Sequence, residues 1–155
     1  MIIPDVNVLV GALRLDHPHH EALADWLAGA VAGAPGFGLT MPVLAGVVRV
    51  VTHPRIFADP TPLAAVLADL DALLAQRRVT LVRPGQRYWQ IFCQLCREAD
   101  AKGNLVVDAQ HAAIAVEQNA TWASLDHDFA RFPSLDWLDP LTGAHRAGHF
   151  VGGGL

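Results

Sequence analysis

The stretch IIPDVNVLV, residues 2–10, decides the fold. Its apolar residues have the composition of a buried strand, yet Asp5 and Asn7 lie in the middle of it. Burying a carboxylate without a partner costs several kcal/mol. The stretch therefore predicts a strand at 2–4 that ends before Asp5, a helix from about 6 to 15, and a group that compensates the charge of Asp5.

Short β-type runs alternate with longer helical ones along the rest of the chain. Strands are expected at 2–4, 38–41, 79–82, 121–125 and, as a possible edge strand, 136–141; helices are expected near 6–15, 18–32, 42–51, 63–76, 87–99 and 106–119. Asp16 is the expected cap of the helix at 18–32. This alternation predicts an α/β fold with a central, mostly parallel sheet of four to five short strands flanked by helices.

The composition fits one domain of 155 residues with 52% hydrophobic residues and a net charge of -4. We expect a domain at 1–141 and a Gly-rich, poorly ordered tail at 142–155. The uncharged run 27–48 contains prolines and glycines and predicts helix, loop, strand and helix rather than a membrane span. With no secretion signal, a cytoplasmic protein is expected.

Two motifs that could bind a metal have simpler explanations. Cys93 and Cys96 form C-x-x-C inside a helical pattern without a second cysteine pair, which favours reduced thiols over a redox pair or half a zinc site. His17, His19 and His20 lie at a helix entrance, where a solvated histidine tract is expected.

Three aspartates have positions that a parallel sheet brings to one edge. Asp5 and Asp126 each follow a predicted strand, and Asp108 comes near the start of an apolar helix. Each alone could be a helix cap. Together they predict a site for Mg²⁺ or Mn²⁺, because converging carboxylates repel one another and hard cations prefer oxygen ligands. Such a site suits phosphodiester hydrolysis.

Three motifs together resemble the PIN-domain ribonucleases, specifically the VapC-type toxins of bacterial toxin–antitoxin pairs. They are DVNVLV, GNLVVDAQHAAIA and WASLDHDFARFPSLDWLDPL, within residues 1–141. The resemblance implies a PIN-like three-layer sandwich and a magnesium-dependent endoribonuclease, usually dimeric, that a small VapB-type antitoxin holds inactive. It matches Asp5, Asp108 and Asp126 to metal-binding acids of the family. Asn7 and Ser124 match supporting positions that donate or accept hydrogen bonds.

One position departs from the family pattern. The family often has a glutamate three residues before an arginine in the helix after the second strand, and counting back from Arg49 reaches Gly46. No acid occurs between Asp25 and Asp59. The site could work with three acids and Asp128, bind one metal weakly, or belong to a degenerate PIN domain that only binds RNA or a partner.

Three further hypotheses concern neighbouring residues. Asp128 either caps the turn that follows it or acts in the outer sphere of a metal. Arg49 either contacts RNA phosphate or forms a structural ion pair. By analogy with the family, the apolar helices at 18–32 and 42–51 are the expected walls of an antitoxin groove.

A phosphatase of the haloacid dehalogenase type is the remaining alternative, because such enzymes also begin with an aspartate after the first strand. That chemistry requires a second acid where this chain has Asn7. An asparagine cannot deliver a proton to the leaving group, so the residues favour the nuclease.

Overall fold

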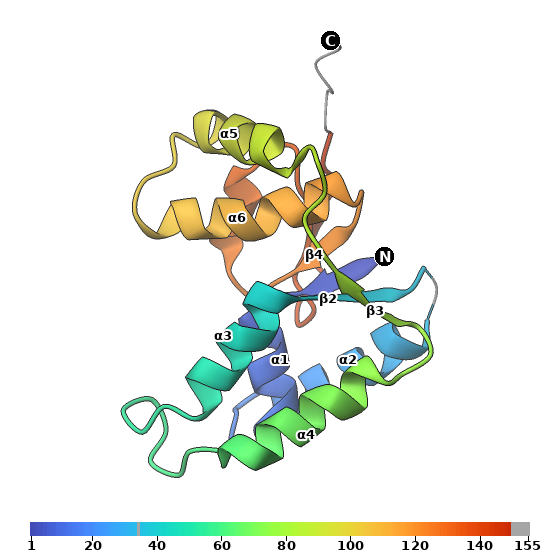
Figure 1. Ribbon diagram of the computed structural model, residues 1–155, viewed down its shortest axis with the longest axis vertical. Coiled ribbons are helices and arrows are strands. Elements are labelled where there is room, and N and C mark those ends of the chain that lie inside the picture. Colours follow the sequence, from blue (N-terminus) through green and yellow to red (C-terminus); the bar gives the residue numbers. More distant parts are fainter. Residues whose placement is uncertain (34, 150–155) are drawn as a thin grey trace. The chain divides into compact units, whose positions relative to one another are not determined.

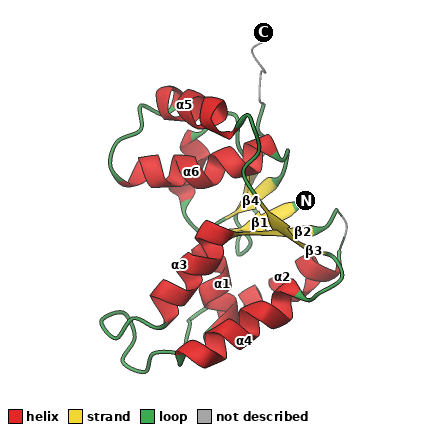
Figure 2. Cartoon of the chain, in the orientation of Figure 1, coloured by secondary structure: helices red, strands yellow, loops and turns green. Residues whose placement is uncertain are grey.

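The structure is a computed structural model that describes residues 1–33 and 35–149. The chain divides into two compact units, Met1–Val82 and Arg83–Leu155. Both units contain strands and helices (Figure 1, Figure 2), which confirms the predicted α/β class. Within the described ranges, no helix has the length and apolar character needed to cross a bilayer.

The first unit contains three parallel strands and four helices. In chain order they are β1 (Ile2–Pro4), α1 (Val6–Leu13), α2 (His20–Ala32), β2 (Phe37–Thr40), α3 (Met41–Val51), α4 (Leu63–Leu74) and β3 (Val79–Val82). The strand β2 pairs in parallel with β1 and with β3, with Phe37 opposite Ile2 and Val79. All four residues of β2 are buried, because it lies in the middle of this set.

The strand β1 ends where the sequence predicts, because Asp5 turns the chain into α1. The backbone of Asp5 is extended, and its carboxylate accepts a hydrogen bond of 2.6 Å from the Val6 N–H, so Asp5 caps α1. The helix ends at Leu13, two residues earlier than expected.

The prediction that Asp16 caps the second helix is wrong. The helix α2 begins at His20, and its capping residue His19 makes no side-chain hydrogen bond to it. The carboxylate of Asp16 instead forms an ion pair of 2.6 Å with Arg14, whose guanidinium is buried. This pair holds the pKa of Asp16 below its ordinary value.

The uncharged run at 27–48 folds as expected into the end of α2, β2 and much of α3. The hydroxyl of Thr40 accepts a hydrogen bond of 3.3 Å from the Val43 N–H, and Pro42 occupies the first turn of α3. Cap and proline therefore fix the point where strand becomes helix.

The second unit contains two helices, a short 3-10 helix and three strands. They are α5 (Tyr88–Glu98), α6 (Asn104–Glu117), β4 (Thr121–Ala123), the 3-10 helix η1 (His127–Arg131), β5 (Asp136–Leu138) and β6 (His145–Arg146). The helix α5 packs against α6. The rings of Trp122, Phe129 and Phe132 form a continuous buried cluster, with centroids 5.3 and 6.3 Å apart.

The beginning of the Gly-rich tail is part of the fold, contrary to expectation. The strand β6 pairs antiparallel with β5, whose other side pairs in parallel with β4, so β5 is not an edge strand. Gly148 passes so close to the backbone of Leu135 and Asp136 that a Cβ atom would clash. The described residues thus form six strands rather than four to five. Tail residues 150–155 lie outside the described residues.

Both cysteines are free and half-buried in α5, as the helical pattern predicts. Burial raises the pKa of the Cys96 thiol. A raised pKa keeps this group protonated, which fits an inert thiol and not a nucleophile.

Candidate functional site

Asp5 is the most buried acid of the predicted site. It lies at the carboxyl end of β1 and only 8% of its surface is exposed. A cavity of about 300 Å³ lies beside it, lined by Asp5, Val6, Asn7, Val10, His17 and Val50. The first unit thus places a carboxylate and the Asn7 amide, two oxygen donors, in one small cavity.

Gly46, where the family often has an acid, lies against the start of α1. A Cβ atom at this position would be 2.6 Å from a methyl group of Val6, the residue that directly follows Asp5. A glutamate would push on the first turn of α1, because a β-branched valine has little freedom to move away. Close packing of α1 and α3 therefore replaces the second acid of the family.

Adding a methyl group at Gly46 is expected to destabilise the protein, although alanine favours helices. The Gly46→Ala variant should lose about 1 kcal/mol of unfolding free energy, since overpacking outweighs the gain in helix propensity. The double variant Gly46→Ala/Val6→Ala should show a favourable coupling of about 1 kcal/mol. Urea denaturation measures both.

Gly29 in α2 provides the matched control, because nothing lies within 4 Å of a Cβ atom there. Gly29→Ala should raise the stability by about 0.5 to 1 kcal/mol. Equal effects of alanine at the two glycines would contradict the packing explanation.

Arg49 lies in the last turn of α3 and is exposed. Among the described residues it forms no ion pair, so nothing supports the structural ion pair as its role. Contact with RNA phosphate stays a prediction.

Asp108 lies one turn into α6 and is half-buried. The alanines beside it at 109, 112 and 113 are fully buried and form the packed side of the helix. The helix starts after Gly103, whose φ of 57° falls in the left-handed region that glycine tolerates. Because this side of α6 is buried, the helix cannot rotate, and the position of Asp108 on it is held in place.

Ser124 and Asp126 form a turn directly after β4. The buried hydroxyl of Ser124 accepts a hydrogen bond of 3.0 Å from the Asp126 N–H, and the Asp126 carboxylate accepts one of 2.9 Å from the Asp128 N–H. Asp126 therefore caps η1. The prediction that Asp128 caps this turn is wrong, because η1 begins at His127 and the capping position is one residue earlier.

Asp139 is a buried residue of this region that the sequence reasoning missed. Its carboxylate accepts a hydrogen bond of 3.0 Å from His127 and others from the Leu141 and Thr142 N–H groups. Burial raises its pKa, but these hydrogen bonds outweigh burial and hold the pKa below its ordinary value. Asp139 directly follows β5, so the strand-end reasoning used for Asp126 could have found it.

The folded state lowers the pKa of Asp139, so the ionised carboxylate stabilises the protein at every pH above the ordinary pKa of an aspartate. This contribution to stability disappears as the pH falls through the lowered pKa. Asp139→Asn should therefore reduce stability at pH 7 and flatten the loss of stability below about pH 4. Thermal melts from pH 2.5 to 7 measure this. The same acid sensitivity in both proteins would mean that Asp139 does not contribute.

Within neither unit do three or more described histidine, cysteine, aspartate or glutamate side chains gather in a metal-binding group. The histidine tract instead makes local hydrogen bonds: His17 Nδ1 accepts from the His19 N–H, and His20 Nδ1 lies 3.1 Å from the Gly11 carbonyl oxygen.

A groove of about 790 Å³ runs along the helices of the first unit. Its lining comes from α1, α2, α4 and the turn after α4: residues Ala12, Leu13, Ala24, Leu27, Ala28, Val31, Ala32, Asp69, Ala72, Leu73, Gln76, Arg77 and Arg78. The expectation that 18–32 forms one wall agrees with this lining. The helix α3, expected as the other wall at 42–51, supplies four buried residues to the core and none to this groove.

Comparison with known proteins identifies the family. The profile of the PIN domain matches residues 2–135. Ribonuclease VapC43 of Mycobacterium tuberculosis is 45% identical over 143 residues, 92% of this chain and 97% of that protein. Ribonuclease VapC25 of the same organism is 41% identical over 140 residues, 90% and 99% of the two chains.

A solved structure supports the same fold. VapBC2 of Rickettsia felis, bound to a DNA fragment from its promoter, matches with a TM-score of 0.66 at 22% identity, over 88% of this chain and 97% of that one. The likeness confirms the predicted PIN-like fold. With the identities above, it shows that this chain belongs to the PIN-domain family and, within it, to the VapC ribonucleases.

Proposed function

We propose that this VapC-family ribonuclease toxin hydrolyses RNA phosphodiester bonds endonucleolytically with Mg²⁺, for which Mn²⁺ can substitute. The observation that carries the proposal is Asp5, a buried carboxylate at the end of β1 that shares a small cavity with Asn7. Carboxylate and amide oxygens that line one small cavity are the ligands that a hard divalent cation prefers.

The proposed metal ligands are Asp5, Asp108 and Asp126, with Asp128 as a further acid. All are oxygen donors, which suits a hard divalent cation and disfavours zinc, for which thiolate and imidazole are preferred. When bound, the cation lowers the pKa of a water molecule and stabilises charge on phosphate oxygens. The family membership of the chain supports this choice of residues.

The remaining residues of the proposed site position these acids or the substrate. The Ser124 hydroxyl and the cap of η1 fix the backbone at Asp126. Asn7 lines the cavity beside Asp5. Arg49, exposed at the end of α3, would bind an RNA phosphate through its planar guanidinium.

Metal titration by calorimetry, combined with an RNA cleavage assay, tests the proposal. The wild-type protein should take up Mg²⁺ or Mn²⁺ saturably, and Asp108→Asn should weaken the uptake at least about tenfold. Sequencing of RNA 5′ ends from cells before and after induction would identify the cleavage sites. Saturable uptake that does not depend on Asp108 would contradict the assigned ligands.

A degenerate PIN domain that only binds RNA or a partner is the second candidate, and Gly46 is the observation that favours it. At the place of the second acid of the family, this chain has a glycine, and a side chain there would press on Val6. If the protein neither takes up metal nor cleaves RNA, the metal-dependent nuclease is ruled out and the degenerate PIN domain is favoured.

The proposed partner is a cognate VapB-type antitoxin that binds in the groove of the first unit and keeps the toxin inactive. The solved VapBC2 structure contains a related toxin–antitoxin pair. A homodimer, which the family suggests, and a cytoplasmic location, which the sequence suggests, stay predictions.

A further inference from the structure

The groove in the first unit is bordered by two helices whose apolar residues are poorly covered. The helix α2 has thirteen residues, mostly apolar, of which only Leu23 is buried. The helix α4 has twelve residues, of which only Val66 and Leu70 are buried. Apolar surface of this extent, hollowed into a groove, is typical of a site for an apolar segment of another protein.

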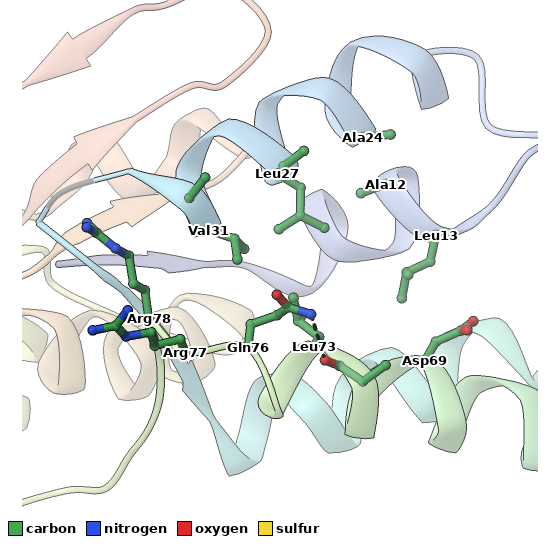
Figure 3. Close-up of a pocket in the computed structure, with 13 residues that line it drawn as sticks. Ala12, Leu13, Ala24, Leu27, Val31, Asp69, Leu73, Gln76, Arg77 and Arg78 are labelled. Carbon is green, nitrogen blue, oxygen red and sulfur yellow. Dashed lines mark hydrogen bonds between the residues drawn. The ribbon is translucent and has the colours of Figure 1, made fainter.

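The two ends of the groove carry opposite charges. Figure 3 shows the guanidinium groups of Arg77 and Arg78 at one end, near Val31, and the carboxylate of Asp69 at the other, near Leu13. All three charged side chains are exposed, and none forms an ion pair with another described residue. The middle of the groove, around Leu27 and Leu73, is apolar.

We propose that these charges fix the direction in which the antitoxin segment lies in the groove. The segment has apolar side chains in its middle, one or more carboxylates at the end beside Arg77 and Arg78, and a basic residue at the end beside Asp69. This inference rests on the proposed antitoxin, but it does not depend on RNA cleavage or on the metal ligands.

Charge, and not apolar contact, decides the direction. Leucine, valine and alanine make similar contacts with a segment and with its reverse, whereas like charges placed together oppose binding. By helical rise, the part of α4 from Asp69 to its last residue, Leu74, spans about 8 Å, and Arg77 and Arg78 follow in the turn after it. A segment of this size meets both charged ends at once.

Selection of peptides from a displayed random library of 12-residue segments tests the direction. Peptides selected on the full-length wild-type chain should carry acids at one end, apolar residues in the middle and a base at the other end. On the variant Arg77→Glu/Arg78→Glu, the preference at the first end should change from acidic to basic.

The size of the preference is then measured with one selected peptide and a counterpart in which the acidic and basic residues are exchanged. Wild type should prefer the selected peptide roughly fivefold or more, and the double variant should prefer the counterpart. The preference should shrink at 1 M salt, because exposed charges are screened. Fluorescence anisotropy measures both affinities.

Two control variants locate the binding. Ala28→Phe, which fills the groove from an exposed position on α2, should weaken peptide binding at least about tenfold. Arg55→Glu/Arg83→Glu, an equal charge change at exposed arginines outside the lining, should leave the preference unchanged.

Peptides without charge asymmetry, an unchanged preference in Arg77→Glu/Arg78→Glu, or binding that is insensitive to Ala28→Phe would each overturn the proposal. So would a selection that yields no binding peptide. These failures differ from failure of the proposed function, because RNA cleavage and metal uptake are measured without any peptide.

Discussion

Replacing Asp5 by asparagine is expected to reduce RNA cleavage by a factor of about 1000 or more, because it removes the most buried of the proposed metal-binding carboxylates. The fold should survive, since asparagine also caps helices and can accept the hydrogen bond from the Val6 N–H. Cleavage of a cellular RNA preparation with Mg²⁺ measures the activity. A thermal melt should show unchanged or higher stability, because a buried charge is removed.

Asp25→Asn is the matched control, since Asp25 is exposed on α2 and lines neither the cavity nor the groove. It should retain wild-type cleavage. If Asp5→Asn cut RNA as fast as the wild type, or if its expression still arrested growth, the proposed metal site would be wrong. Loss of cleavage together with loss of the thermal transition would instead assign Asp5 a role in folding.

Replacing Arg14 by methionine is expected to cost about 2 to 3 kcal/mol of unfolding free energy. The guanidinium is buried at the end of α1, donates hydrogen bonds to the Asp59 carbonyl oxygen at 2.8 Å and the Thr61 hydroxyl at 3.1 Å, and lies 3.9 Å from the centre of the Phe57 ring. Methionine keeps much of the volume but leaves the two oxygens without their donor. Chemical denaturation followed by circular dichroism measures the loss.

Asp16→Asn separates the ion pair from the buried contacts. Asp16 is exposed, so its removal should cost much less than the removal of Arg14. If the two variants lost equal stability, the ion pair itself would be the main contribution of Arg14, and its contacts with the loop before α4 would matter little.

The sequence alone determined the element types and most of their boundaries, because these depend on local chemistry. Asp5 stops β1 and caps α1, and Thr40 with Pro42 starts α3, each through contacts within three residues. The prediction for Asp16 failed because distant contacts hold its neighbour Arg14, which donates hydrogen bonds to Asp59 and Thr61. Asp16 was expected to cap α2, but the buried guanidinium of Arg14 holds it instead.

The family, and with it the proposed site residues, also followed from the sequence, since each of these residues lies in a short local motif. Tertiary structure alone decided what surrounds these residues. It gave the close approach of Gly46 to Val6, the hydrogen bonds that join Asp139 to His127, and the groove between α2 and α4. The sequence could not show that α4, and not α3, lines this groove with α2, because periodicity tells which face of a helix is apolar but not what covers that face.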